Sequence, residues 1–455
     1  MRTTFTLLRD GRRAVRQGPA ALADRQRERL ATMVDFARAR SPYYRELYRS
    51  LPERVEHPAL LPVTRKEDLM ARFDDWVTDP EATLEGVRDF IADPARVGEP
   101  FLGKYLVSTT SGTTGHRGVF LLDDQAAAVV RALSLRAARR TLTPSLAARM
   151  LVHGMRSAHI VATSGHLAAN AVIARSRASG RLHARGSRVL SVHSPLPELV
   201  DQLNKYRPVL LGGYAAVIAL LAGEQLAGRL RIAPAVVSLV AEGLSDREHR
   251  RVSSAFGAHV VNTYACNESL ALGYGCRFGW LHTHSDWLIL EPVDADHRPV
   301  PPGQESFTVL LTTLGRWAQP ILRYDLGDSV LWRPDPCPCG DPLPAVRVRG
   351  RAADLLSFPR RDGGTARIVP MAFETLLESL PDIDRFQIVQ TTSTTLRVRI
   401  RPAAGADQDR LWSAVRTGLT ALLTDHGTDR VRIERAHEPP EQSPGGKYRV
   451  VIPCP

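Results

Sequence analysis

The chain has 455 residues, of which 44% are hydrophobic and 24% are charged. This composition is typical of a soluble globular protein and excludes a collagen-like or mostly disordered chain. At roughly 150 residues per domain, the length suggests about three folding units, or one large unit and a small one. The net charge is +12, but the basic residues are dispersed and no zinc-finger or RNA-binding motif accompanies them. We therefore expect affinity for small anions, and no nucleic-acid partner.

Cysteine content and hydropathy favour a cytoplasmic protein. Five cysteines are too few for a disulfide framework in a chain of this length. The most apolar stretch, residues 215–222, is too short to cross a bilayer, so no membrane partner is expected. The arginine-rich residues 1–19 lack the apolar segment and cleavage site of a secretory signal.

The first hundred residues are expected to be mainly helical. Apolar side chains between Leu30 and Ala37 keep a helical spacing, which Ser41-Pro42 interrupts. Thr64 precedes a second helical pattern over residues 65–69, and we expect its hydroxyl to cap that helix.

Residues 105–330 alternate between short β-rich runs and helical stretches rich in Ala and Leu. This alternation predicts an α/β architecture with a substantially parallel sheet. The expected strands lie at residues 149–152, 189–192, 209–211, 236–240 and 259–262. Farther along, apolar runs at residues 288–290 and 307–311 flank a Pro/Gly-rich turn and predict antiparallel strands.

The pattern changes after residues 334–344, which are dense in proline, glycine and cysteine. Helices are expected at residues 373–380 and 407–423, and strands at 386–390, 396–401 and 431–434. We therefore divide the chain into a large N-terminal α/β domain, residues 1–348, and a small mobile C-terminal α+β domain, residues 349–455.

The strongest local motif is a run of Ser, Thr and Gly at residues 108–115, between two apolar segments. Glycines let the backbone turn tightly, so that consecutive N–H groups can point at one anion, and the hydroxyls add further donors. The motif predicts a phosphate-binding loop. It is not a Walker loop, because no Gly-Lys-Ser/Thr follows it.

Within this loop, residues 110–115 resemble the phosphate loop of adenylate-forming enzymes, a superfamily that includes acyl-CoA synthetases, peptide-synthetase adenylation domains and luciferases. Further segments that resemble the family's motifs follow in the same order, at residues 262–268, 323–328, 349–354 and 443–449. Residues 39–45 and 61–69 are similar to the short N-terminus of the phenylacetate-CoA ligase-like branch. The resemblance extends from about residue 30 to the end of the chain.

The resemblance implies an acyl-adenylate synthetase fold and ATP-dependent activation of a carboxylic acid, followed by transfer to CoA. The acid expected from the branch is aromatic. The triphosphate would be held by Thr110, Ser111, Gly112, Thr113, Thr114 and Gly115, and Mg²⁺ by Glu268. The nucleotide would also contact Glu242, Gly243, Tyr264, Asn267, Asp328 and Arg351, with Asp328 on the ribose hydroxyls.

Lys447 is the expected catalytic cation in this scheme, together with Glu268 as a catalytic residue. Only four of the 60 basic residues are lysines, so a lysine in the Gly445-Gly446-Lys447 segment suggests a need for a compact ammonium group. Its expected role is to stabilise the charge that develops between the carboxylate and the α-phosphate. Candidates for the acid pocket, chosen by position alone, are Tyr214, His159, His166 and Ala241.

A second group of residues could bind a metal. Cys276, His282, Cys337 and Cys339 provide the four soft or borderline ligands of a closed, structural Zn²⁺ site, and His284 could replace His282. The alternative is a pair of reduced cysteines in a turn.

The identity of the acyl acceptor is left open by the sequence. Ala353 stands where many CoA ligases of the family have a hinge aspartate, which weakens the inference of CoA. The adenylate could instead pass to an amine or another nitrogen nucleophile. Outside the enzymes, the alternative is a non-catalytic binding protein on a degenerate ligase fold. A homodimer is also left open.

Overall fold

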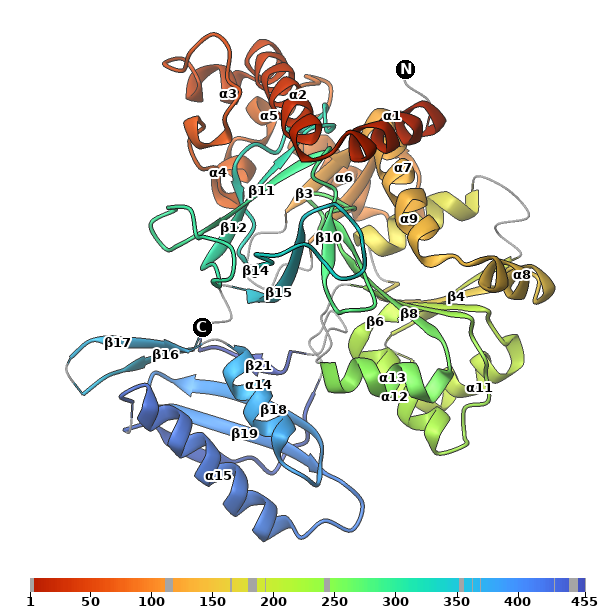
Figure 1. Ribbon diagram of the computed structural model, residues 1–455, viewed down its shortest axis with the longest axis vertical. Helices are drawn as coiled ribbons and strands as arrows, with labels where there is room; N and C mark the ends of the chain where they lie inside the picture. Colours follow the sequence, from red (N-terminus) through yellow and green to blue (C-terminus); the bar gives the residue numbers. More distant parts are fainter. Residues whose placement is uncertain are drawn as a thin grey trace.

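The structure is a computed structural model, and Figure 1 shows its large part above and its small part, residues 356–454, below. The described residues are 4–110, 118–163, 166–178, 186–192, 194–240, 246–351, 356–361, 363–368, 370–428, 430–441 and 449–454. Within them, no helix is both long and apolar enough to span a membrane.

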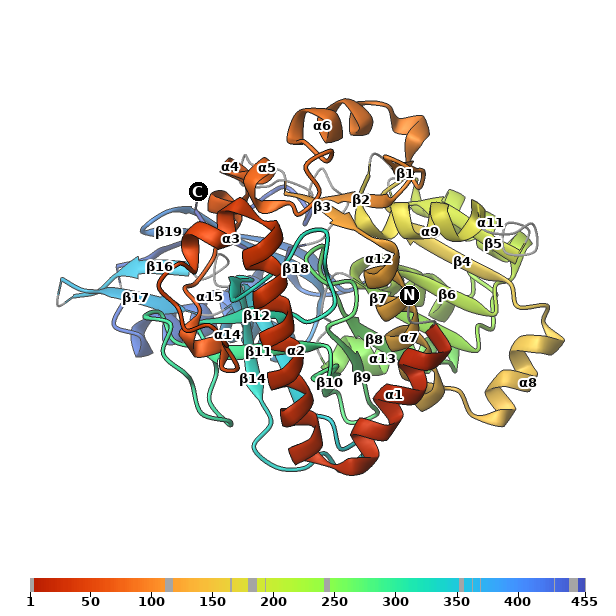
Figure 2. The same cartoon turned by 90° about the horizontal axis from the view of Figure 1, so that it is seen from above.

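Helices occupy most of the first hundred residues, as predicted: α1 (Thr4–Gln17), α2 (Pro19–Arg40), α3 (Pro42–Leu47), α4 (Lys66–Ala71), α5 (Phe73–Trp76) and α6 (Leu84–Ala92), with the 3₁₀ turns η1 (Pro58–Leu60) and η2 (Pro94–Arg96). Ser41 ends α2 and caps α3, because its hydroxyl accepts a hydrogen bond from the Tyr44 N–H (3.3 Å). In Figure 2, α2 runs in front of the other elements, beside β11 (Leu288–Val293), and the Gln26 amide donates to the Leu288 carbonyl (3.1 Å).

The predicted cap at Thr64 is wrong. The N-cap position of α4 is Arg65, and no side chain caps the helix there. The Thr64 hydroxyl instead donates to the Leu322 carbonyl (2.9 Å), and the Thr64 backbone pairs with Tyr324. The Thr64 hydroxyl therefore bonds to a residue distant in the sequence and does not cap the helix, contrary to what the local sequence predicts.

The predicted phosphate loop lies between the antiparallel strands β2 (Tyr105–Thr109) and β3 (Val119–Leu122), with β1 (Pro100–Phe101) on the other edge of β2. After β3 come α7 (Asp124–Thr141), α8 (Pro144–Val152) and α9 (Ala168–Ala178). The predicted strand at residues 149–152 is wrong, because these residues form the last turn of α8. Thr143 caps that helix and Pro144 occupies its first turn.

The largest sheet of the described residues has the strand order β14-β15-β10-β9-β8-β7-β6-β4-β5. Its members are β4 (Ser157–Val161), β5 (Ser187–Ser191), β6 (Leu210–Tyr214), β7 (Val236–Val240), β8 (His259–Tyr264), β9 (Gly273–Gly275), β10 (Leu281–Thr283), β14 (Asp328–Trp332) and β15 (Ala345–Arg351). Strands β4 to β8 pair in parallel, and the others pair antiparallel. The predicted α/β architecture with a substantially parallel sheet is confirmed.

Helices cover the parallel half of this sheet. Side chains from α11 (Leu196–Tyr206), α12 (Ala215–Leu226) and α13 (Asp246–Phe256) join those of β4, β6 and β7 in one hydrophobic core. The apolar residues 215–222 belong to α12 and are mostly buried there. A separate antiparallel sheet contains β11, β12 (Thr308–Thr313) and β13 (Tyr324–Asp325).

The small part has a core of its own, built from residues such as Phe373, Ile388, Val415 and Leu419. Its elements are β16 (Leu356–Pro359), β17 (Thr365–Ile368), α14 (Pro370–Ser379), β18 (Ile383–Thr392), β19 (Thr395–Pro402), α15 (Gln408–Asp425), β20 (Arg432–Arg435) and β21 (Val451–Ile452). This arrangement confirms the predicted α+β pattern. The predicted boundary at residues 348 and 349 falls inside β15, and the two-domain division stays a prediction.

Candidate active site

The carboxyl ends of the parallel strands bring several predicted site residues to one edge of the sheet. Tyr214 is the last residue of β6, and Tyr264 is the last residue of β8. The chain runs from β4 to its neighbour β5, then crosses back to β6 on the other side of β4. Open α/β sheets bind ligands outside the carboxyl ends of their strands, where the strand order reverses in this way. The edge at β4 and β6 is therefore the candidate site.

The two ends of the predicted phosphate loop are held together. The Thr110 N–H donates to the Gly118 carbonyl (3.0 Å), and the Gly118 N–H donates to the Thr110 hydroxyl (2.9 Å). Both bonds continue the antiparallel pairing of β2 with β3. The loop residues Ser111, Gly112, Thr113, Thr114 and Gly115 lie outside the described residues.

Two buried carboxylates at this edge each accept a hydrogen bond from a tyrosine. Glu268, 7% exposed, accepts from the Tyr324 hydroxyl (2.8 Å), and Asp328, also 7% exposed, accepts from the Tyr264 hydroxyl (2.8 Å). Burial, and then the nearby Glu268 carboxylate, raise the pKa of Tyr324 above its usual range. Tyr324 therefore keeps its proton and remains a donor at neutral pH.

Arg316 is a buried cation beside Glu268 that sequence reasoning missed. Its guanidinium donates to the carbonyls of Glu268 (3.0 Å), Asn267 (3.3 Å) and Leu121 (2.8 Å). It thereby ties the segment after β8 to the strand that follows the phosphate loop. Burial lowers the pKa of Arg316 to about 10, which leaves the group charged at neutral pH.

Gln319 completes this connection to β3. Its amide oxygen accepts from the Leu121 N–H (2.8 Å), and its amide nitrogen donates to the Val119 carbonyl (3.1 Å). The side chain thus makes the two hydrogen bonds that a neighbouring strand would supply. No local pattern marks Arg316 or Gln319, because their backbone partners lie 48 to 200 residues earlier in the chain.

Asn267 supplies an orphaned polar atom at the same place. Its side-chain oxygen is buried and has no hydrogen-bond partner among the described residues. Buried polar atoms are nearly always satisfied by protein, water or ligand. An unsatisfied acceptor beside the Glu268 carboxylate is compatible with the predicted nucleotide site.

The remaining predicted substrate and nucleotide residues are only partly brought together. The Tyr214 hydroxyl accepts from the Ala162 N–H (3.4 Å), just beyond the end of β4. His159 lies in the middle of β4 over Gly212, and burial lowers the pKa of its imidazole. His166 directs its ring at Phe90 of α6 (5.5 Å between ring centroids), while its carbonyl accepts from the Thr109 N–H (2.8 Å).

Several predicted positions cannot be placed. Ala241, Glu242, Gly243 and Lys447 lie outside the described residues. The backbone of Arg351 pairs with Asp328 across β14 and β15, which is the neighbourhood predicted for it.

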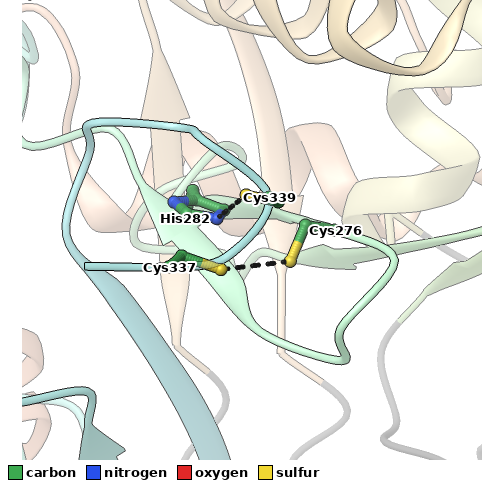
Figure 3. Close-up of side chains that lie close together, drawn as sticks. All are labelled: Cys276, His282, Cys337 and Cys339. Atoms are coloured by element: carbon green, nitrogen blue, oxygen red, sulfur yellow. Dashed lines mark hydrogen bonds between the residues drawn. The ribbon is translucent and has the colours of Figure 1, made fainter. Parts of the chain in front are cut away.

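The four predicted metal ligands converge at the other side of the sheet (Figure 3). Cys276 follows β9, His282 belongs to β10, and Cys337 and Cys339 lie in the loop between β14 and β15. One ligand atom from each lies within 4.8 Å of all the others. The Cys276 and Cys337 sulfurs are 3.7 Å apart, and a tetrahedral zinc with Zn–S bonds of about 2.3 Å would place them about 3.8 Å apart.

The surroundings of the cluster favour metal binding by His282. Its Nδ1 is 2.8 Å from the Leu343 carbonyl, so Nδ1–H can donate there and leave the Nε2 lone pair on the side of Cys339, 3.1 Å away. His284 is outside the cluster and packs on Tyr274. Without a cation, burial raises the pKa of Cys276, and raises that of Cys339 to about 12. A bound divalent cation would reverse this effect.

Comparisons with known proteins agree with this geometry. No family model matches the chain. In sequence it is 27% identical over 234 residues to the phenylacetate-coenzyme A ligase of Thermus thermophilus, a match that covers 48% of this chain and 50% of that protein. The chain thus spans about half the length of this curated relative.

Among solved structures, one of 2-hydroxyisobutyryl-CoA ligase in the postadenylation state, in complex with R3-HIB-AMP, superposes with a TM-score of 0.66 at 21% identity, over 95% of this chain and 89% of that one. The same ligase in the thioesterfication state, with 2-HIB-AMP and CoA, gives a TM-score of 0.53 at 21% identity, over 96% and 89%. The predicted fold class and the resemblance to acyl-CoA ligases of the adenylate-forming superfamily are therefore confirmed.

Proposed function

From the fold of the adenylate-forming ligases and the similarity to an acid-CoA ligase, we propose that this protein activates a carboxylic acid with ATP and transfers the acyl group to CoA. The observation that carries the proposal is the pair of tyrosine-held carboxylates, Glu268 and Asp328, at the carboxyl edge of the sheet. In the proposal, Glu268 is the magnesium-binding residue and Asp328 is the ribose-binding residue.

The proposed chemistry has two steps. A carboxylate oxygen of the acid attacks the α-phosphorus of ATP, and the bond to pyrophosphate breaks. The CoA thiol then attacks the acyl carbon, forms a thioester and displaces AMP. The first step gathers negative charge around the α-phosphate, so that it needs fixed donors and good alignment.

Residues of the chain divide this work in the proposal. Thr110 and the loop up to Gly115 bind the triphosphate, and Lys447 stabilises the charge that develops at the reacting phosphate. Asp328 accepts hydrogen bonds from the ribose. Glu268 would hold Mg²⁺, and that ion would supply positive charge to neutralise the phosphates. Arg316 fixes the backbone that presents Glu268.

The acid is proposed to be a small aromatic acid bound near the strand reversal at β4 and β6, where Tyr214 contacts the residue after β4. The branch resemblance supports the aromatic class. The zinc proposal is separate: Cys276, His282, Cys337 and Cys339 bind a structural Zn²⁺, supported by four donor atoms within 4.8 Å.

The acceptor is proposed to be CoA. The similarity in fold to 2-hydroxyisobutyryl-CoA ligase in complex with 2-HIB-AMP and CoA supports this choice. A nitrogen nucleophile is the second candidate, favoured by Ala353 at the family's hinge aspartate position.

The test is a pyrophosphate-release screen of the purified protein over aromatic acids, with ATP and Mg²⁺, in the presence and absence of CoA. We expect release with at least one acid and a thioester product only when CoA is present. An amide that forms from an added amine without CoA would select the second candidate. No release with any acid would contradict the adenylation proposal.

Lys447→Ala tests the catalytic assignment. Loss of one preorganised donor at the reacting phosphate is expected to slow adenylate formation by about 100-fold or more. The measurement is acid-dependent ATP–pyrophosphate exchange. Lys205→Ala, which removes a lysine at the end of α11, is the control and should exchange normally.

A further inference from the structure

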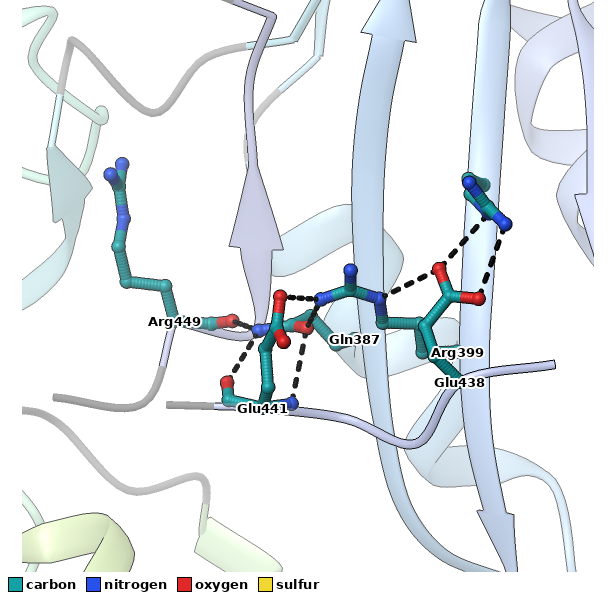
Figure 4. Close-up of polar contacts among 6 residues, drawn as sticks. Gln387, Arg399, Glu438, Glu441 and Arg449 are labelled. Atoms are coloured by element: carbon teal, nitrogen blue, oxygen red, sulfur yellow. Dashed lines mark hydrogen bonds and ion pairs between the residues drawn. The ribbon is translucent and has the colours of Figure 1, made fainter. Parts of the chain in front are cut away.

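A buried glutamine in the small part holds both ends of the segment that carries Lys447. Gln387 lies in β18 and is only 1% exposed. Its amide nitrogen donates to the carbonyl of Glu441 (3.0 Å) and to the carbonyl of Arg449 (2.8 Å), as Figure 4 shows. Glu441 and Arg449 are the last described residues on either side of residues 442–448.

The geometry closes the segment at its base. Both carbonyl oxygens lie within 3.0 Å of one nitrogen, so they are at most about 6 Å apart. Immediately after Arg449 the chain joins the sheet, because β21 pairs in parallel with β18 and the Ile388 N–H donates to the Val450 carbonyl (2.8 Å). The return of the chain is therefore anchored to the same strand that presents Gln387.

The side-chain oxygen of Gln387, like its nitrogen, makes two hydrogen bonds. It accepts from the Arg399 guanidinium (2.8 Å) and from the Glu441 N–H (3.4 Å). An amide has two N–H donors and two acceptor lone pairs, and all four are paired here. The reverse amide orientation would set its oxygen against two carbonyl oxygens, so the partners fix the orientation of the side chain.

Ion pairs hold the chain just before residues 442–448. Arg399, whose side chain is 14% exposed, contacts the carboxylates of Glu441 (2.5 Å) and Glu438 (3.3 Å). Glu438 also pairs with Arg397. The approach to the segment is thus held by a network of ion pairs that converges on Gln387 (Figure 4).

We propose that Gln387, supported by Arg399, is a positioning residue for adenylate formation: it fixes the base of the segment that delivers the Lys447 ammonium group to the reacting phosphate. This inference rests on the proposed function. Gln387 touches neither substrate in this proposal and acts only through Lys447. A displacement of about 1 Å at a reacting group can cost a factor of about 100 in rate.

Gln387→Met tests the proposal, because methionine has a similar length and shape but cannot make the hydrogen bonds. We expect the maximal rate of ATP–pyrophosphate exchange to fall by about 10- to 100-fold, while the KM for ATP changes by less than about twofold. Gln387→Glu keeps an acceptor but places negative charge near the two carbonyls, so its maximal exchange rate is expected to fall at least as far.

The chain offers a matched control in the same strand. Gln390 is 3% exposed and is also hydrogen-bonded through both its amide nitrogen and its amide oxygen, but it donates to the Ser357 carbonyl (2.7 Å) and accepts from the Cys454 N–H (3.5 Å). Gln390→Met should lower the melting temperature of the small part as Gln387→Met does, and it should leave the exchange rate within about twofold.

A double-variant cycle separates positioning from general stability. In the Lys447→Ala background, Gln387→Met should cost less than about twofold more, because a residue that acts through the lysine has nothing left to position. The inference would be overturned if the rate losses of Gln387→Met and Lys447→Ala multiplied in the double variant. It would also be overturned if Gln387→Met and Gln390→Met lowered the exchange rate equally.

Two further results keep the test decisive. If Gln387→Met fails to fold, Glu441→Ala replaces it, because the Glu441 side chain is 64% exposed. This substitution should lower the exchange rate about threefold in the unmodified protein. It should have no effect in the Lys447→Ala background. No such loss would overturn the inference. Normal exchange in Lys447→Ala, or no exchange by the unmodified protein, would instead count against the proposed function.

Discussion

At the scale of single residues, the candidate site depends on hydroxyl donors that orient two carboxylates. Glu268 and Asp328 are almost buried, and each depends on one tyrosine for a neutral, non-competing donor. A lysine or arginine in either place would pair with the carboxylate and weaken its attraction for a cation. In the proposed role of Glu268, the tyrosine orients the carboxylate without competing with Mg²⁺ for it.

Tyr324→Phe is expected to reduce kcat/KM for MgATP about tenfold and to raise the Mg²⁺ concentration needed for half-maximal exchange. The reason is that a hydrogen bond to a charged group is worth about 1.5–3 kcal/mol and orients Glu268. Both effects are measured from initial rates of ATP–pyrophosphate exchange at varied Mg²⁺ concentrations. Tyr105→Phe is the control, because it loses a comparable bond to Asp79 (2.6 Å), a carboxylate with no assigned role in binding metal or nucleotide. Equal effects of the two variants would contradict the role given to Tyr324.

At the scale of elements, the loop between β14 and β15 has little regular hydrogen bonding of its own and is held by side chains. Cys337 and Cys339 reach from this loop to Cys276 and His282 on the sheet. The Asp341 N–H donates to the Cys339 sulfur (3.4 Å), as backbone amides often do at metal-bound thiolates. The loop leads into β15, which pairs with the strand that begins at Asp328.

We expect about one equivalent of zinc in the freshly purified protein, measured by elemental analysis. Cys337→Ser should remove most of it and lower the melting temperature, because a structural zinc contributes its binding free energy to folding. Cys454→Ser, at an exposed cysteine outside the cluster, should retain the metal. Protein that folds normally with no stoichiometric metal would refute the zinc proposal.

At the scale of the whole molecule, the hydrophobic cores of the two parts are separated by a short stretch of chain. The core of the small part draws its members from residue 356 onward, and the cores of the large part from residues up to 348. The Arg385 guanidinium, 3.4 Å from the Ala216 carbonyl, is a polar contact between the two parts. Few strong contacts are expected in this interface if it changes between the two steps of the proposed reaction.

Calorimetry of the intact chain is therefore expected to give two unfolding transitions. Leu419→Ala should lower only the transition of the small part, by the equivalent of about 2–5 kcal/mol, because Leu419 is fully buried in that core. Leu221→Ala, at an equally buried site in α12, should lower only the other transition. A single transition that both variants shift together would contradict independent folding of the two parts.

Local sequence was sufficient to predict secondary structure wherever the partners of a residue lie nearby in the chain. Residues 236–240 form a strand as predicted, and the helix expected at 407–423 is α15, because periodic apolar side chains alone determine the buried face. The strand predicted at residues 149–152 is instead the last turn of a helix, because Thr143 caps that helix and Pro144 occupies its first turn.

The sequence by itself determined the fold class, the order of the motifs and the four metal-ligand candidates, since residue type and spacing carry that information. Only the tertiary structure decided which histidine joins the cysteines and that Thr64 bonds to Leu322. It also placed Arg316 and Gln387, whose guanidinium and amide bind backbone carbonyls. Carbonyl groups are the same in every residue, so a side chain that recognises them across a long separation leaves no pattern in the sequence.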